Sequence, residues 1–442
     1  MKPKLRLLIV LPDGRIHKMK FPGLHRSFRE APLTATTLAG LVPSHLNYTI
    51  RIADESIQKI PFNEPFDLVA ISLITGTAHR GYEIAKHFKQ KGSTVVLGGV
   101  HVTLCTDEAR QHADVAIPGF AENTWPQFLS DFAENKHQSF YKSDGGNQKM
   151  AVQPRRDLQR NLGYNIPNVI SATRGCKGIC DFCAVSAAKF GWATRDIATV
   201  IDEIKQINSK RFVFNDVSMG EDMEYFIQLL KALTPLNKKW GGLVSTKVFN
   251  HPDIYKYLKE SGCSYLLIGF ESINSLSLQS IKKGFNKFTE YQNIIYGLRK
   301  INVVLMGTFI FGFDEDDKYV FDNTIDFINE YKIDIPRYAI YTPFPGTDSH
   351  NRFKEQNRLL HTYWPHYDTQ HVVFNPLQMS AQQLNDGFIY AYKKTFKVTS
   401  SLKRTMASGI NFPITFAGNL AYNIYIKRLV AEKNRILFPD KG

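Results

Sequence analysis

The sequence is poor in cysteine and contains no long apolar run. Its 442 residues include only five cysteines, and these form no regular framework of the kind that stabilises small secreted proteins. No stretch approaches about 18 uninterrupted apolar residues, so no membrane-spanning helix is expected. The short apolar run at residues 7–11 ends at Pro12, which favours a buried strand over a signal peptide. We therefore expect a globular protein of a reducing compartment, the cytoplasm.

A dense basic block, an internal repeat and a low-complexity tract are also absent. The formal charge is +14, from 55 Lys and Arg against 41 Asp and Glu. Because the basic residues are dispersed, nucleic acid is not expected as a partner. A basic surface attracts anionic lipids or anionic cofactors, so peripheral membrane contact remains open. A chain of this length predicts two or three domains.

The first third of the chain alternates strands with helices. Strands are expected at 5–11, 48–52, 66–73, 94–97 and 115–117, with helices at 34–41 and 80–90. This alternation predicts a doubly wound, Rossmann-like parallel sheet over residues 1–140. Ligands in such sheets bind at the carboxyl ends of the strands. The polar, broken stretch 141–164 is interpreted as a linker or exposed hairpin.

A second alternation predicts a partial (βα)6 barrel over residues 165–360. Its strands are expected at 168–172, 211–214, 242–245, 264–268, 304–310 and 337–341, and its helices at 197–207, 223–233, 251–260, 276–283, 288–300 and 319–331. Six units fit a partial barrel better than a closed eightfold one. The remaining region, 361–442, is aromatic, basic and mainly helical, with helices expected at 381–396 and 420–432.

Three of the five cysteines, Cys176, Cys180 and Cys183, form a C-x3-C-x2-C run just after the first barrel strand. Soft sulfur ligands at short spacing indicate an Fe–S cluster or zinc. Structural zinc needs four ligands, and no second cysteine pair exists. Three ligands leave one iron of a cubane cluster open for chemistry. A cluster is therefore favoured, while Cys105 and Cys263 are interpreted as buried structural thiols.

The cysteine run, with Phe182 directly before its last cysteine, resembles the signature of the radical S-adenosylmethionine (SAM) enzymes. The resemblance covers about residues 165 to 350. It implies that the three cysteines hold a [4Fe–4S] cluster whose open iron binds SAM, which is cleaved to a 5′-deoxyadenosyl radical. It also implies an electron donor such as flavodoxin or ferredoxin.

Later strand ends resemble the SAM-binding positions of the same family more loosely. Asp216 follows the second strand, and Ser245 ends the next one. Glu271 lies in a segment similar to the Gly-x-Glu fifth strand of the family, and Phe309 in one similar to its adenine-binding sixth strand. The resemblance thus implies SAM contacts from these four residues and from Phe182.

The first third of the chain resembles the cobalamin-binding domain that precedes many radical SAM barrels. The implied cobalamin pocket consists of Ser72, Thr75, Gly98, Gly99, His101 and Gly119. The Asp-x-His-x-x-Gly motif, which supplies a cobalt-ligating histidine in other cobalamin proteins, is absent. His101 is therefore interpreted as a hydrogen-bonding loop histidine within that pocket, and some relatives have this domain without cobalamin.

Segments such as 266–284 and 306–317 resemble a narrower subgroup that includes the hopanoid methylases. This likeness implies cobalamin-dependent methylation of an unactivated carbon in a small or lipid-like substrate. Radical cyclisation, oxidation or rearrangement without methyl transfer is the alternative. RNA methylthiolation and a non-catalytic Fe–S or zinc protein are further alternatives. The substrate, the radical acceptor and the oligomeric state are left open by the sequence.

Overall fold

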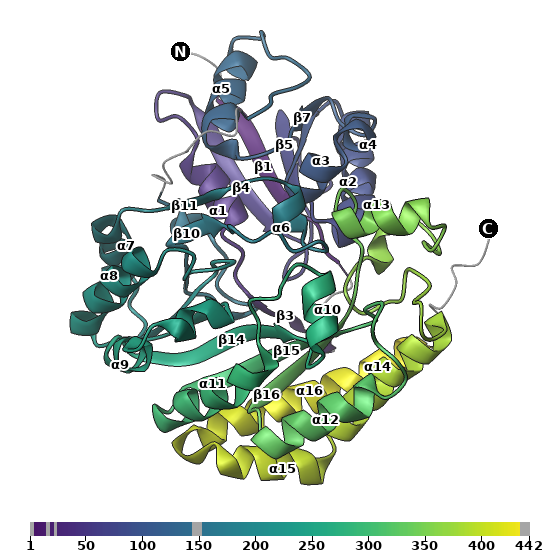
Figure 1. The fold of residues 1–442 in the computed structure, drawn as a ribbon. Helices are drawn as coiled ribbons and strands as arrows, with labels where there is room; N and C mark the ends of the chain where they lie inside the picture. The colour runs from purple at the N-terminus through teal and green to yellow at the C-terminus, as the bar shows by residue number, and fades with distance from the viewer. Residues whose placement is uncertain (1–3, 15–17, 22–23, 144–152, 434–442) are drawn as a thin grey trace.

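The computed structural model describes residues 4–14, 18–21, 24–143 and 153–433. In Figure 1 a small parallel sheet stands above a larger one, and the last helices run along the base of the molecule. The two sheets are consecutive in sequence, so the chain builds one α/β unit and then the other. The predicted architecture of a parallel sheet, a partial barrel and a helical C-terminal region is confirmed.

The N-terminal sheet is entirely parallel, with strand order β4-β1-β5-β6-β7. Its strands are β1 (Leu5–Leu11), β4 (Tyr48–Asp54), β5 (Leu68–Ser72), β6 (Thr94–Gly98) and β7 (Val115–Ile117). Its helices are α1 (Thr34–Gly40), α2 (Ala78–Gln90), α3 (Val100–Leu104), α4 (Thr106–Arg110) and α5 (Ala121–Ala133). Residues 7–10 of β1 are fully buried, because helices cover both faces of the sheet.

The barrel is a single six-stranded parallel sheet with strand order β16-β15-β14-β13-β12-β9. Its strands are β9 (Val169–Ile170), β12 (Arg211–Phe214), β13 (Lys239–Val244), β14 (Cys263–Glu271), β15 (Val304–Phe311) and β16 (Ile335–Ile340). Its helices are α7 (Ile197–Lys205), α8 (Met223–Leu233), α9 (Ile254–Glu260), α10 (Ser275–Ser280), α11 (Phe288–Lys300), α12 (Val320–Tyr331) and α13 (Asp348–Glu355). Counted from β9, β14 and β15 are the fourth and fifth strands, in the same order as the predicted strands at 264–268 and 304–310.

A small third sheet joins the two units. It contains β2 (Lys18–Phe21), β3 (Leu24–Glu30) and β8 (Tyr164–Ile166), with β3 antiparallel to β2 and parallel to β8. The end of the predicted linker is therefore a strand, while residues 144–152 of that linker lie outside the described residues.

The C-terminal region folds into α14 (Ala381–Thr395), α15 (Val398–Ala407) and α16 (Phe412–Lys433). A capping box starts α14, because the Ser380 hydroxyl accepts from the Gln383 amide at 3.1 Å and the Gln383 side chain accepts from the Ser380 amide at 2.7 Å. Across the described ranges, none of the helices combines the length and the apolar content needed to cross a bilayer.

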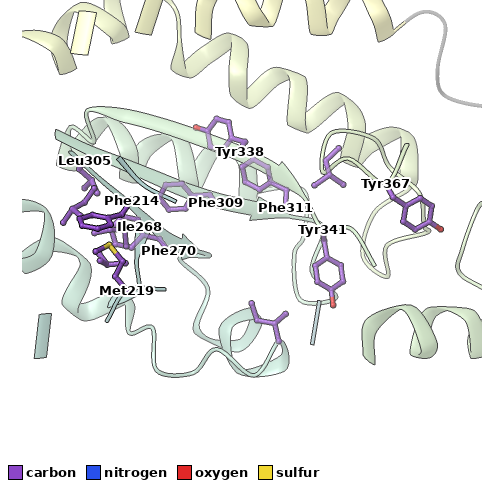
Figure 2. Packing of buried hydrophobic residues seen from close by; sticks show 14 of the residues in the cluster. Phe214, Met219, Ile268, Phe270, Leu305, Phe309, Phe311, Tyr338, Tyr341 and Tyr367 are labelled. Carbon is purple, nitrogen blue, oxygen red and sulfur yellow. The ribbon is translucent and has the colours of Figure 1, made fainter. Parts of the chain in front are cut away.

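An aromatic core fills the space between the barrel sheet and its outer helices. Figure 2 shows Phe270, Phe309 and Phe311 close together in this core. Phe309 stacks on Phe270 with 5.7 Å between ring centroids and meets Phe327 of α12 edge-on at 6.1 Å. Each fully buried ring of this kind contributes roughly 1.5–3 kcal/mol. This packing fixes the strands whose carboxyl ends carry the candidate site.

Candidate active site

The three cysteines lie on a loop whose two ends are joined by a short hairpin. The hairpin pairs β10 (Thr173–Gly175) with β11 (Trp192–Thr194) in antiparallel fashion. The Cys176 amide donates to the Gly191 carbonyl at 3.2 Å. Gly175 has φ +79°, and a Cβ there would collide with the same carbonyl oxygen. Glycine is therefore required at the point where the loop closes.

Two of the three cysteine sulfurs lie close to Gly178. Its amide donates to the Cys176 sulfur at 3.2 Å, and a Cβ on Gly178 would lie 3.1 Å from that sulfur and 3.9 Å from the Cys180 sulfur. Burial raises the pKa of Cys176 and Cys180 to about 11. Such thiols hold negative charge at neutral pH only beside a cation, so the donor set fits a cluster.

A buried carboxylate anchors the cysteine loop to the far edge of the barrel. Asp181 accepts from the Tyr341 hydroxyl at 3.0 Å and from the Arg352 guanidinium at 2.9 Å, and its side chain is almost fully buried. Burial raises the pKa of Asp181, whereas the Arg352 charge opposes that rise. The neighbouring Phe182 meets the Tyr341 ring edge-on at 5.9 Å. Sequence reasoning missed the role of Asp181, because its partners lie 160 and 171 residues away.

Asp216 braces the strand that leads into the cysteine loop. Its carboxylate accepts from the Ala172 amide at 3.0 Å and from the Thr173 hydroxyl at 2.6 Å, and also from the Thr173 amide. Burial raises its pKa to about 6, despite these hydrogen bonds, which favour the charged form. The geometry gives Asp216 a positioning role, and a SAM contact from it stays a prediction.

Glu271 and Ser245 lie at the carboxyl ends of neighbouring strands, where polar contacts to SAM are predicted. Glu271 has φ +63° at a bulge in the β14–β15 pairing, and its carboxylate forms an ion pair with Lys283. Non-glycine residues with positive φ concentrate at functional sites. The buried Ser245 hydroxyl has no hydrogen-bond partner among the described residues. These observations fit a polar ligand at this end of the barrel.

Phe309 does not turn toward that end. Its ring is 1% exposed and packs against α12, on the outer face of β15. Because side chains alternate along a strand, the inward-facing positions of β15 are Met306, Thr308 and Ile310, which are partly exposed. A SAM contact from the Phe309 ring is therefore not supported.

A cavity of about 340 Å³ lies between the carboxyl edge of the N-terminal sheet and the start of the barrel. Four predicted cobalamin residues line it, namely Ser72, Gly98, Gly99 and Gly119. The barrel contributes Ser171, Arg174, Arg195 and Asn215 to the same cavity. Arg174 belongs to β10 and stands two residues before Cys176. The predicted cobalamin region and the strand that leads into the cysteine loop thus line the same cavity.

Two residues that line this cavity carry buried polar atoms without partners among the described residues. Arg174 forms an ion pair with Glu122, and its guanidinium lies 4.6 Å from the Phe120 ring centroid. The second Glu122 carboxylate oxygen and two guanidinium nitrogens of Arg195 are buried and have no hydrogen-bond partner within the described part of the chain. Buried polar groups are normally satisfied. A ligand with both donors and acceptors on its rim, such as the peripheral amides of cobalamin, fits these atoms.

Thr75 and His101 do not line the cavity, and a cobalamin contact from either stays a prediction. His101 is fully buried, with one ring nitrogen 3.1 Å from the Tyr82 hydroxyl and the other 3.4 Å from the Thr75 hydroxyl. Helix α3 begins directly after Gly99 and turns His101 away from the strand edge, toward α2. The interpretation of His101 as a hydrogen-bonding histidine is confirmed.

Neither remaining cysteine joins the cluster loop. Cys263 begins β14 at the opposite, amino end of the barrel strands and is buried, as predicted. Cys105 is half-buried between α3 and α4, where burial and the nearby Glu108 raise its pKa to about 12. The cluster loop therefore has three cysteines.

Comparison with known proteins agrees with this geometry. The family model described as the radical SAM superfamily matches residues 170–328. The bacteriochlorophyllide d C-12(1)-methyltransferase of Chlorobaculum tepidum is 30% identical to this chain, covering 98% of it and 95% of that protein. This chain belongs to the radical SAM superfamily. A radical SAM enzyme uses a [4Fe–4S] cluster and SAM, and the cysteine loop stays the predicted site of that cluster.

Two further similarities extend over most of the radical SAM chain. The bacteriochlorophyllide d C-8(2)-methyltransferase of Chlorobaculum tepidum is 27% identical, covering 84% of this chain and 86% of that protein. The solved structure of the radical SAM methyltransferase TsrM from Kitasatospora setae, with cobalamin and a [4Fe–4S] cluster bound, has a TM-score of 0.69 at 12% identity. It covers 97% of this chain and 100% of that chain. At that identity the likeness concerns the fold.

Proposed function

We propose that this protein is a cobalamin-dependent radical SAM methyltransferase that methylates an unactivated carbon of a tetrapyrrole-type substrate. The shared cavity is the observation that supports this most directly. The strand ends of the N-terminal sheet and Arg174, next to the cysteine loop, line the same space. A methyl carrier held there would lie beside the site of radical formation.

When bound, the cluster with one SAM would supply a radical that removes hydrogen from carbon, and cobalamin would supply a methyl group that it takes from a second SAM. The protein supplies the positions. Cys176, Cys180 and Cys183 hold the cluster, and Asp181 ties their loop to β16. Arg195 and Glu122 offer a charged donor and an acceptor to the rim of a bound corrin. The cluster also needs an electron, and we propose a small reduced protein such as flavodoxin or ferredoxin as its source.

The proposed substrate class is supported by the two bacteriochlorophyllide methyltransferases, which resemble most of this chain. Both of those enzymes are methyltransferases of bacteriochlorophyllide d, which is a tetrapyrrole. Sequence identity near 30% does not determine which carbon is methylated, so only the substrate class, a tetrapyrrole, is proposed.

Anaerobic reconstitution tests this function. Protein loaded with iron, sulfide and cobalamin is supplied with reduced flavodoxin, methyl-labelled SAM and bacteriochlorophyllide. We expect stoichiometric cobalamin binding, SAM cleavage and a labelled, methylated pigment. Cys180→Ala should lose the cluster and SAM cleavage while keeping cobalamin. Protein that cleaves SAM but binds no cobalamin, or that yields an unlabelled cyclised or oxidised product, would contradict methyl transfer.

A further inference from the structure

The last two helices carry large apolar side chains on their solvent face. Helix α15, the turn η6 (Gly409–Asn411) and α16 together expose the following residues: Val398, Leu402, Met406, Ile410, Phe412, Ile414, Phe416 and Leu420. We call this set the apolar base. Met406 and Ile410 are 72% and 76% exposed. The base forms one contiguous segment of sequence on one part of the fold, unlike apolar residues that are scattered singly over a surface.

The spacing shows that each helix presents a face rather than a single residue. Val398, Leu402 and Met406 recur every four residues along α15, and Phe412, Phe416 and Leu420 do so along α16. Residues four apart lie on the same side of a helix. The Phe412 and Phe416 rings stack nearly parallel, with 5.9 Å between their centroids.

The inward faces of α15 and of the first half of α16 are polar. Arg404 of α15 is 1% exposed and donates to the Asn419 side chain of α16 at 2.8 Å. Asn419 in turn donates to the Asp334 carbonyl at 2.9 Å, and Thr415 is fully buried beside it. An ordinary surface helix turns its apolar side inward and its polar side to water. Here the arrangement is inverted, so the outer face is built to meet an apolar phase.

The charge of this region identifies that phase. Between Asp386 and Glu432 there is no acidic residue, while seven basic residues occur: Lys393, Lys394, Lys397, Lys403, Arg404, Lys427 and Arg428. No charged residue of either sign lies between Arg404 and Lys427. Exposed Lys403 and Lys427 thus border the uncharged stretch at its two ends. An apolar face flanked by lysines is the pattern of helices that lie in the headgroup region of anionic bilayers.

We propose that the apolar base docks this protein on an anionic lipid surface. The helices lie on the bilayer and do not span it, because their inner faces are fixed to the barrel by buried polar contacts. A second copy of the chain is a poorer partner for this surface. Two apolar bases facing each other would bring together two regions that carry basic residues and no acidic ones, and these would repel each other. The N-terminal sheet stands at the opposite end of the molecule from α15 in Figure 1. A docked molecule would therefore keep the cavity between the two units clear of the bilayer.

Vesicle flotation tests this docking with full-length protein. Wild type should float with vesicles that contain phosphatidylglycerol and stay behind with pure phosphatidylcholine vesicles. The double variant Met406→Gln/Phe416→Gln should bind at least about tenfold more weakly, because two polar amide groups replace apolar side chains that would enter the bilayer. Lys397→Glu/Lys403→Glu should also weaken binding. Leu162→Gln, which removes an equally exposed leucine outside the base, should bind like wild type.

Thermal melting and SAM cleavage of the same variants should match wild type, which separates loss of docking from loss of fold or of the proposed chemistry. Equal binding to both vesicle types, or unchanged binding of the double variant, would overturn the proposal. So would a wild-type dimer in lipid-free solution that the double variant dissociates, because the base would then be a subunit interface.

Discussion

Gly98 and Gly99 adjoin in sequence and line the same cavity, yet each is glycine for a different reason. Gly99 has φ +98°, and a Cβ there would lie 2.5 Å from the Leu73 carbonyl oxygen. At Gly98 the nearest atom to a Cβ would be the Ile117 carbonyl oxygen at 3.4 Å. Gly98 shares its strand face with Val96, which lines the cavity. Backbone geometry thus constrains Gly99, and ligand space constrains Gly98.

The two glycines therefore give a matched pair of variants. Gly99→Ala should destabilise the protein by about 2 kcal/mol or more, because the clash involves backbone atoms. Gly98→Val should fold normally and keep its cluster but lose cobalamin, because the new side chain occupies the cavity. Thermal melting and the absorbance of bound cobalamin distinguish the two outcomes. A Gly98→Val protein that binds cobalamin as wild type does would place the cofactor elsewhere.

Asp181 offers a second residue-level test. Asp181→Asn weakens two hydrogen bonds to a buried group, one of which is the ion pair with Arg352. The free energy that holds the cysteine loop against the barrel should fall by about 2–3 kcal/mol. We expect a lower iron content after reconstitution, with the barrel still folded. Lys282→Gln is the control, because it removes an exposed pair with Asp348, and such pairs contribute little. Equal iron retention in the two variants would contradict the anchoring role.

The role of a residue was predictable where the spacing of residues in the sequence is enough to indicate the chemistry. The three cysteines required no knowledge of the fold, and they lie together on one loop. The side chains of Phe309 and His101 turn away from the expected ligand sites, which spacing alone could not predict, because a one-residue shift reverses the face of a strand. Glu122 and Arg195 were missed because their significance, an unpartnered buried atom, exists only once the cavity has formed.

Among the elements, the long apolar strands were predictable and the short paired ones were not. Strand β1 matches its expected bounds. A strand that is buried on both faces is a continuous run of apolar residues, which can be recognised in the sequence. Strands β2, β3, β8, β10 and β11 went unpredicted, because short strands are defined by distant partners rather than by their own composition. The hairpin that closes the cysteine loop is among them.

The turn after β15 carries a carboxylate whose titration affects the stability of that element. Asp316 is fully buried and accepts from the Gly312 and Phe313 amides at 2.9 and 3.1 Å. Burial raises its pKa to about 7, against the effect of these bonds. The folded protein therefore holds a proton that the unfolded chain has released above pH 4. Linkage then requires stability to fall as the pH rises from about 4 to about 7.

Asp316→Asn should remove this pH dependence, because the amide keeps an acceptor for the two backbone donors and carries no proton to lose. Between pH 5 and 8 the wild type should lose about 2–4 kcal/mol more of its unfolding free energy than the variant. Denaturant melts at several pH values measure the difference. Parallel stability curves for the two proteins would show that Asp316 is ionised throughout this range.

At the scale of the whole molecule, a C-terminal segment fastens the barrel to the N-terminal unit. The Trp364 indole, in the short turn η5 (Trp364–His366), donates to the Glu108 carboxylate at 2.9 Å. Glu108 also accepts from Tyr82 of α2 at 3.0 Å. The bond joins residues 256 apart in sequence. The shared cavity depends on such contacts, because its walls come from both units.

Trp364→Phe should weaken the free energy of association between the two units by about 1–3 kcal/mol, because it removes one hydrogen-bond donor from a half-buried carboxylate. We expect calorimetry to resolve an earlier transition for the N-terminal unit and proteolysis to cut between the units. Trp192→Phe is the matched control, since its indole nitrogen has no hydrogen-bond partner among the residues described. A single unshifted transition for Trp364→Phe would show that other contacts hold the units together.

The hairpin of β10 and β11 also bears on how the protein matures. Closing a flexible loop costs conformational entropy. Here the ends of the cysteine loop are joined by backbone pairing that needs no metal, so this cost is met during folding. A cluster that is inserted later then only has to order the three cysteine side chains on a loop that is already closed. Folding and cluster insertion can thus occur as separate, successive events, and enzyme stripped of iron by air should remain a folded recipient that a cluster-delivery system can refill.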